Sequence, residues 1–218
     1  MPRKPAPRVP LSRDRVLRTA LALVDKDGLE ALSMRKLAAA LSVEAMSLYN
    51  HVKNKDDIVA GMLDIVASEI EIPEGALDWR EALRARTVAA HEAFVRRPWA
   101  ARIWMTKSSP SLVRLEQSDS VLRCLRDAGL PAEVVYSAYH MLDGFALGYA
   151  LQRQDFSFSE EELKLMVADF LMDFPSERLP DFAEHVRQHM DPGFAASDSF
   201  EFGLDLILDG LERLRPVR

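Results

Sequence analysis

Basic and hydrogen-bonding side chains lie close together in the stretch 33–57. Arg35 comes first, and Tyr49, His51, Lys53 and Lys55 follow at intervals of two residues. An arginine near a DNA groove can read a guanine edge, whereas lysines in a loop suit phosphate oxygens and fix register without reading sequence. Each side chain alone fits an ordinary surface, but together their types and spacing favour contact with DNA.

Two short helices must position these side chains. Ser33 is suited to cap the first helix, in which apolar residues recur at helical spacing, and a second amphipathic segment spans 44–51. Helices of about two turns cannot bury a core alone. A third helix over 13–26, with one apolar face and Gly28 as its stop signal, is expected to pack behind them. The three predict a helix-turn-helix domain whose second short helix enters the major groove.

Helical spacing also predicts which side chains of the second short helix face outward. Val43, Leu48 and Val52 are expected to face the core, and Tyr49 can face either side. The outward positions are Glu44, Ala45, Met46, Ser47, Asn50 and His51.

Charge is distributed unevenly along the chain. The net charge is -6, which argues against a protein that coats nucleic acid through bulk positive charge. Residues 1–57 nevertheless hold 11 basic against 7 acidic side chains, and the remainder holds 17 against 27. A basic head on an acidic body predicts that one end of the protein contacts DNA.

Cysteine content and hydropathy predict the compartment. The 218 residues contain one cysteine, Cys124, which leaves no intrachain disulfide and no multi-cysteine zinc site. The first ten residues are basic and proline-rich without the apolar run of a signal peptide, and no later stretch approaches the length of a membrane span. We expect a soluble, cytoplasmic protein with a flexible basic arm over residues 1–10.

The rest of the chain has helical periodicity, so the predicted fold is all-α. A connecting helix is expected to follow the helix-turn-helix domain (11–57) and to occupy 58–72, before an acidic break that contains Pro73 and Gly75. The body, 73–218, shows no alternating strand pattern, and prolines separate its segments. Its expected helices span 79–95, 99–105, 112–128, 132–152, 160–174, 181–189 and 199–214.

The short stretch resembles a known family signature. The run Leu-Tyr-Asn-His-Val-Lys-Asn-Lys from Leu48 to Lys55, preceded by Ser-Met-Arg-Lys-Leu-Ala and Leu-Ser-Val, is similar to the DNA-binding signature of the tetracycline-repressor (TetR) family. Ser42 stands where a family member often has glycine. The resemblance implies base-reading roles for Arg35, Ala45, Met46 and Ser47, and phosphate contacts by Tyr49, His51 and Lys55.

The resemblance also implies how the molecule works. It implies a homodimeric repressor that a small-molecule inducer releases from a palindromic DNA operator, with the helix after Lys55 as the mechanical link. The segments 132–152 and 199–214 resemble the pair of helices that forms the family's dimer interface. The first carries Gly144 and Gly148, and the second carries an apolar stripe: Phe200, Gly203, Leu204, Ile207, Leu211 and Leu214.

Aromatic and methionine side chains in the body predict a ligand site. An apolar cavity with a few polar groups is the usual form of a small-molecule site, although each aromatic alone also fits a packed core. Trp104 stands in the region where tetracycline repressors hold magnesium through a histidine, so we expect a hydrophobic or aromatic inducer rather than tetracycline with magnesium. No metal or cofactor is expected. The candidate ligand-binding residues are Phe94, Trp104, Met105, Gln117, Tyr136, Tyr139, His140 and Asp143; His140 and Asp143, three apart, are expected to form a structural pair.

An enzyme is not expected. The sequence contains no phosphate-binding loop, dinucleotide-binding turn, serine elbow or His-Glu-x-x-His pattern. The acidic run at 160–162 is better explained as the first turn of a helix than as a catalytic carboxylate pair. Two alternatives stay open: an activator or co-ligand-requiring regulator of the same fold, and a helical small-molecule-binding protein that does not bind DNA.

Overall fold

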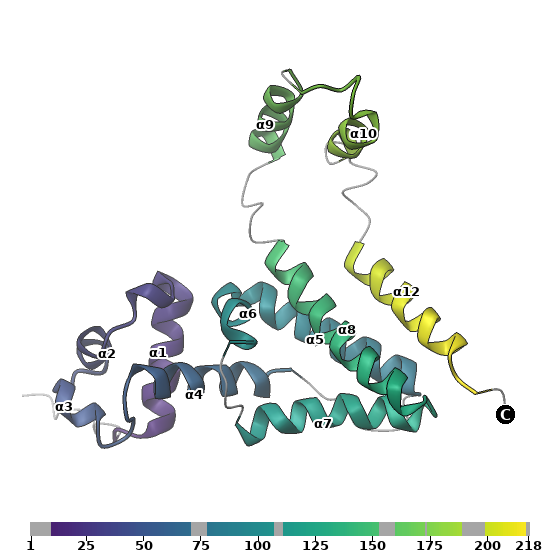
Figure 1. Ribbon diagram of the computed structural model, residues 1–218. Coiled ribbons are helices and arrows are strands. Elements are labelled where there is room, and N and C mark those ends of the chain that lie inside the picture. Colours follow the sequence, from purple (N-terminus) through teal and green to yellow (C-terminus); the bar gives the residue numbers. More distant parts are fainter. Residues whose placement is uncertain are drawn as a thin grey trace, which may run out of the picture. The chain divides into compact units, whose positions relative to one another are not determined.

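The computed structural model describes residues 10–70, 78–106, 111–152, 160–172, 174–188 and 199–216. Within these ranges the chain forms α-helices and one short 3-10 helix, η1 (Leu29–Ala31), and contains no strand (Figure 1). The predicted all-α fold is therefore confirmed for the described part of the chain. The predicted basic arm up to Val9 and the break at 71–77 lie outside the described residues.

The helices group into two compact units. The first unit comprises Met1–Glu71 and Arg96–Asp119, and the second comprises Ile72–Val95 and Ser120–Arg218. The predicted domain boundaries differ in one respect, because they assign 96–119 to the body. That segment contains α6 (Pro98–Trp104), which packs against α4 (Lys55–Ser68) of the first unit.

Four helices build the head of the first unit, shown in purple and blue in Figure 1. Helix α1 (Arg13–Asp27) packs against both α2 (Met34–Leu41) and α4, and α2 packs against α3 (Ala45–Leu48). The Ser12 and Ser33 hydroxyls and the Asn54 side-chain oxygen cap α1, α2 and α4 by accepting hydrogen bonds from backbone N–H groups. Apolar residues from all four helices form the buried core: Val16, Ala20, Val24, Leu37, Leu41, Leu48, Ile58, Met62 and Leu63.

The second unit is built around three long helices and the end of a fourth. They are α5 (Trp79–Arg96), α8 (Ala132–Gln152) and α12 (Ser199–Arg213), with the second half of α7 (Leu112–Asp127). Helices α8 and α12 lie side by side (Figure 1). Helices α9 (Glu160–Met172) and α10 (Pro180–Gln188) contact each other. The core comes from all four main helices and includes Leu83, Val121, Leu125, Val135, Ala138, Leu142, Phe200, Leu204, Leu208 and Leu211.

The apolar stripe predicted on the last helix is only partly available to a second chain. Phe200, Leu204 and Leu211 are at most 3% exposed because they pack into the core of their own protomer. The exposed apolar side chains of α12 are instead Phe202, at 67%, and Leu206, at 57%. On α8, a methyl group added to Gly144 or Gly148 would meet open space.

Candidate nucleic-acid interface and candidate ligand site

The turn between α2 and α3 sets the direction of the candidate reading helix. Ser42 ends α2 in the left-handed conformation (φ 57°, ψ 44°) and donates its backbone N–H toward the last turn of α2. Val43 N–H continues this cap by donating to the carbonyl oxygen of Ala38 at 3.0 Å. The chain thus reverses within three residues, and Ala45 begins α3.

The structure places the predicted DNA-binding residues of this region at the surface or at its edge. Leu48 and Val52 are buried beneath α3, as the spacing predicts. Met46 is 75% exposed and Tyr49 47% exposed, so α3 presents both a thioether and a phenol. The exposed predicted residues are Arg35, Met46, Tyr49, Lys53 and Lys55, and the half-buried ones are Ala45, Ser47 and His51.

An ion pair holds the loop that carries the lysines. Both terminal nitrogens of Arg13 donate to the Asp57 carboxylate, at 2.9 and 2.7 Å, and the first also donates to the His51 carbonyl oxygen at 3.2 Å. The backbone N–H of Lys53 donates to the same carboxylate at 2.8 Å. Because the Asp57 carboxylate accepts hydrogen bonds from both Arg13 of α1 and the Lys53 N–H, the backbone of Lys53 is fixed while its side chain stays in solvent.

This ion pair is the structural centre of an open hollow beside α3. The Arg13 guanidinium and the Lys53 N–H hold the pKa of Asp57 down at about 2, against burial, which acts to raise it. The hollow has a volume of about 400 Å³ and is lined by Arg13, Tyr49, Asn50, His51, Val52, Lys53 and Asp57. Its mixture of cations, amide and phenol suits a phosphate backbone.

A second group of polar contacts fastens α6 to the head. The Arg97 guanidinium donates to Asp25 of α1, at 3.2 Å, and to Glu69 directly after α4. The Trp99 indole N–H donates to the other Asp25 oxygen, also at 3.2 Å. Burial alone would lower the pKa of Arg97, but the hydrogen bonds to Glu69 and Asp25 outweigh it and raise that pKa. Helix α6 is therefore tied to both the first and the connecting helix of the head.

Helix α7 holds the end of the connecting helix in a similar way. The Gln117 amide donates to the carbonyl oxygens of Ala67 and Ile70, at 3.1 and 2.9 Å, which caps the C-terminal end of α4. The Ser111 hydroxyl donates to Asp64 at 2.6 Å. The amide nitrogen of the predicted ligand residue Gln117 therefore binds the backbone at the end of α4.

The structure divides the predicted ligand-binding residues between the two units. Trp104, Met105 and Gln117 belong to the first unit. Phe94, which is 1% exposed, and the four residues from α8 belong to the second. Those four are Tyr136, Tyr139, His140 and Asp143, and the structure brings them together on one side of α8: the His140 ring lies edge-on to Tyr136 and Tyr139, with centroids 4.8 and 5.1 Å apart.

The predicted pair of His140 and Asp143 is not the main electrostatic contact of that carboxylate. Burial raises the pKa of Asp143, and the strongest opposing charge is Arg86 on α5, ahead of His140. Sequence reasoning missed Arg86. The available signal was its place three residues after Leu83 and four before Ala90, since a charged residue in an apolar helical stripe is unusual.

An aromatic stack lies between α5, α8 and α12. The His91 ring stacks on Phe200, with centroids 3.8 Å apart and an interplanar angle of 11°, and Phe145 stacks on the same phenylalanine at 5.1 Å. The Tyr149 hydroxyl donates to the carbonyl oxygen of Ser199 at 3.2 Å. The His91 and Phe200 rings are buried, and Phe145 and Tyr149 are half-buried, so the stack joins the three helices through aromatic contacts.

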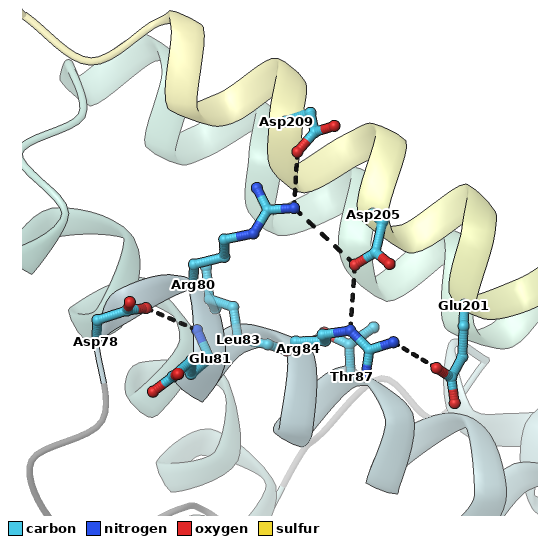
Figure 2. A network of polar contacts seen from close by, with 9 residues as sticks. All are labelled: Asp78, Arg80, Glu81, Leu83, Arg84, Thr87, Glu201, Asp205 and Asp209. Carbon is cyan, nitrogen blue, oxygen red and sulfur yellow. Dashed lines mark hydrogen bonds and ion pairs between the residues drawn. The ribbon is translucent and has the colours of Figure 1, made fainter.

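Ion pairs on the outer side of α5 join it to α12 (Figure 2). Arg80 pairs with Asp209 at 2.7 Å, and Arg84 pairs with Asp205 at 3.1 Å and also with Glu201. The two arginines are one helical turn apart, as are the three carboxylates, so the two helices are fixed in register. Each side chain is partly exposed, which limits the contribution of each pair to stability.

The described ranges lack two features of other protein classes. No group of three or more histidine, cysteine, aspartate or glutamate side chains there is arranged to hold a metal ion. None of the helices in those ranges combines the length and apolar character needed to cross a membrane.

Comparisons with known proteins match both parts of the chain. Residues 16–62 match the model of bacterial regulatory proteins of the tetR family, and residues 72–215 match that of the tetracyclin repressor-like C-terminal domain. The chain is 33% identical to the HTH-type transcriptional repressor DrrR1 of Streptomyces coeruleorubidus, over 95% of this chain and 80% of the relative. It is 32% identical to the class C tetracycline repressor protein of Escherichia coli, over 94% and 92% of the two chains.

A solved structure extends the similarity to the fold. The TetR-family protein ActR of Streptomyces coelicolor, solved in complex with actinorhodin, superimposes with a TM-score of 0.76 at 28% identity. The match covers 93% of this chain and 97% of that one.

Proposed function

Because the chain belongs to the tetR family of bacterial regulatory proteins and is a DNA-binding, ligand-responsive transcriptional repressor, we propose how its parts divide this work. The α2–α3 face of each protomer of a dimer occupies one half of a palindromic operator. An aromatic small molecule bound in the second unit then releases the DNA. The protein acts in the cytoplasm, and it regulates rather than catalyses.

The observation that carries the DNA-binding part is the fixed presentation of α3 and its following loop. Buried Leu48 and Val52 anchor the segment, while exposed Met46 and Tyr49 face solvent. We assign base contacts to Arg35, Ala45, Met46 and Ser47, and phosphate contacts to Tyr49, His51, Lys53 and Lys55.

The contacts of α6 support a route from ligand to DNA. Helix α5, which carries Arg86 and His91, ends at Arg96, and the next residue, Arg97, pairs with Asp25 of α1 and with Glu69 beyond α4. A ligand that shifts α5 therefore moves a residue that is bonded both to α1 and to the C-terminal end of α4. The connecting helix α4 then changes the spacing of the two α3 helices across the dimer.

Two experiments test this function. A fluorescently labelled duplex that the protein selects from a random library is titrated with the dimer, and aromatic compounds are then screened for loss of anisotropy. We expect salt-sensitive binding and at least one compound that displaces the DNA. A compound that binds the protein and leaves its affinity for the operator unchanged would remove the proposed link between the units.

A further inference from the structure

One buried arginine in the second unit has no evident structural role. Arg86 lies on the inward face of α5 between Leu83 and Ala90, each 1% exposed, and is itself only 9% exposed. Its Nε has no hydrogen-bond partner among the described residues. Buried guanidinium groups are normally paired, because an unpaired donor loses its hydration without replacement.

The neighbouring arginines of the same helix are paired. Arg80 and Arg84 each reach carboxylates of α12 within hydrogen-bonding distance (Figure 2). Arg86 faces the protein interior instead, where Asp143 acts on it through charge and its Nε has no hydrogen-bond partner among the described residues. Two arginines of α5 therefore attach it to α12, whereas a third lies in the core with its Nε unpartnered by any described residue.

The surroundings of Arg86 are polar on one side and apolar on the other. Asp143 and Tyr139, one turn apart on α8, and Cys124 on α7 are its electrostatic neighbours. Burial lowers the pKa of Arg86 and raises that of Asp143, because each charged form loses hydration. An anion bound beside Arg86 would compensate the guanidinium for its lost hydration. Asp143 compensates it only through a charge interaction, without a hydrogen bond to Nε.

We propose that Arg86 binds an acidic group of the inducer, so that the inducer is an aromatic acid. Its carboxylate or ionised phenol accepts hydrogen bonds from the guanidinium, and Tyr139 supplies an aromatic contact for its rings. This inference rests on the proposed function, because it names the chemical class of the small molecule that the second unit binds.

A pair of probes that differ only in charge tests the inference. Binding of 2-naphthoate and of neutral 2-naphthamide to the full-length protein is measured by calorimetry at matched ionic strength. We expect naphthoate to bind at least tenfold more tightly, and the Arg86→Met variant to lose this preference. Equal behaviour of the two probes with the native protein, including no binding by either, would overturn the inference.

Two further variants separate recognition from folding. Arg84→Met removes a paired arginine from the same helix and is expected to keep the preference for naphthoate. Arg86→Lys keeps the charge without the planar fork and is expected to keep a reduced preference. If Arg86→Met fails to fold, Arg86→Lys decides the matter, and an unchanged ratio of the two affinities in that variant contradicts a direct contact.

Stability gives a readout without any probe. If Arg86 is kept for a ligand, Arg86→Met in the free protein should melt no lower than the native chain, because it removes an unpaired buried charge. A melting temperature lower by several degrees would show a structural role instead. DNA binding is assayed in parallel: a protein that binds its operator without any preference for acids loses this inference but keeps the proposed function.

Discussion

At the scale of single residues, Ser42 shows how one backbone angle sets the geometry of the reading helix. Among the non-glycine residues that the structure describes, only Ser42 has a positive φ. The left-handed region costs most residues about 1–2 kcal/mol. This conformation is needed because the chain must turn between α2 and α3 within a few residues, and the Ser42 and Val43 N–H groups then donate to carbonyl oxygens of α2.

Replacing Ser42 therefore has a predictable sign. Ser42→Gly should raise the free energy of unfolding by about 0.5–1 kcal/mol, since glycine adopts this conformation without strain. Ser42→Val should lower it by at least 1 kcal/mol, because β-branched side chains fit the left-handed region poorly. Urea unfolding at pH 7 measures both, and the reverse order of the two variants would contradict the assigned strain.

The second residue-scale prediction concerns pH. Asp57 has its pKa lowered to about 2 by Arg13, so its contribution to stability is present above its unfolded value near 4 and is lost as the pH falls through 2. Because Arg13 is 47% exposed, we expect Asp57→Asn to cost only about 1 kcal/mol at pH 7.

Unfolding at several pH values checks this assignment. The difference between the native chain and Asp57→Asn should be constant from pH 7 to 5 and should fall to about half at pH 3. Asp14→Asn, which removes an exposed carboxylate paired within α1 at 2.8 Å, serves as the control and should change stability by less than about 0.5 kcal/mol. If the difference in the free energy of unfolding between the native chain and Asp57→Asn grew as the pH fell, it would contradict a lowered pKa of Asp57.

At the scale of elements, α6 is the part whose role the sequence could not reveal. Asp25 is separated from Arg97 by 72 residues, and no local pattern indicates that the two residues meet. We expect Arg97→Met to leave operator binding by the free protein within about threefold. Because the residue that follows α5 then no longer bonds to Asp25 and Glu69, release of DNA by the displacing compound should need a much higher concentration.

The control for this prediction is Arg18→Met. It removes an arginine whose ion pair with Asp14 lies on the outer face of α1, and it should leave release unchanged. Anisotropy of the labelled operator, titrated with the compound, measures both variants. Release from Arg97→Met at the native concentration would show that α6 does not carry the signal.

The same scale shows what the sequence predicts well. Apolar spacing predicted the long helices of the second unit to within about two residues, because the signal is local. The bounds of the short helices were less accurate: the connecting helix, predicted over 58–72, spans Lys55–Ser68, and the predicted segment 44–51 is helical only over Ala45–Leu48. Ser33 accepts the expected capping hydrogen bond. The facing of long helices was harder. Spacing placed Phe200, Leu204 and Leu211 of α12 on one apolar face, but it could not tell that this face packs into the core of its own protomer rather than against a second chain.

The two candidate sites also differ in how much of each the sequence could predict. The surface position of the candidate DNA-binding residues was predictable because they are close in sequence and follow the three-helix pattern, while their contacts with DNA stay a prediction. The ligand residues were assigned from aromatic content, which does not distinguish buried Phe94 from exposed Tyr136. The Arg86–Asp143 neighbourhood joins residues from α5 and α8, and their proximity depends on how those helices pack. The roles of the candidate ligand residues remain predictions.

At the scale of the whole molecule, function depends on a dimer. We expect its interface to use the exposed side chains Phe202 and Leu206 of α12 beside Gly144 and Gly148 of α8. Phe202→Asp with Leu206→Asp should give a folded monomer, because neither side chain belongs to the protomer core. The monomer should lose most operator affinity, since one small reading head makes few contacts.

Sedimentation and circular dichroism together check the dimer prediction. The double variant should sediment as a monomer with native helix content, whereas Leu204→Asp, which disturbs the buried core, should lose helix content instead. A double variant that still sediments as a dimer would place the interface on another surface.

The most direct test of the central claim is selection of DNA from a random duplex library by the native protein. The account predicts an enriched inverted repeat whose two halves are related by two-fold symmetry. Repeating the selection with Arg35→Ala should relax the preference at one base position in each half, at a cost of about 1–3 kcal/mol in binding free energy. Lys55→Ala should instead weaken binding to all sequences alike and lower the salt dependence by about one phosphate contact per protomer. An enriched sequence without a repeat, or equal effects of the two substitutions, would contradict the claim that α2 and α3 read a palindromic operator.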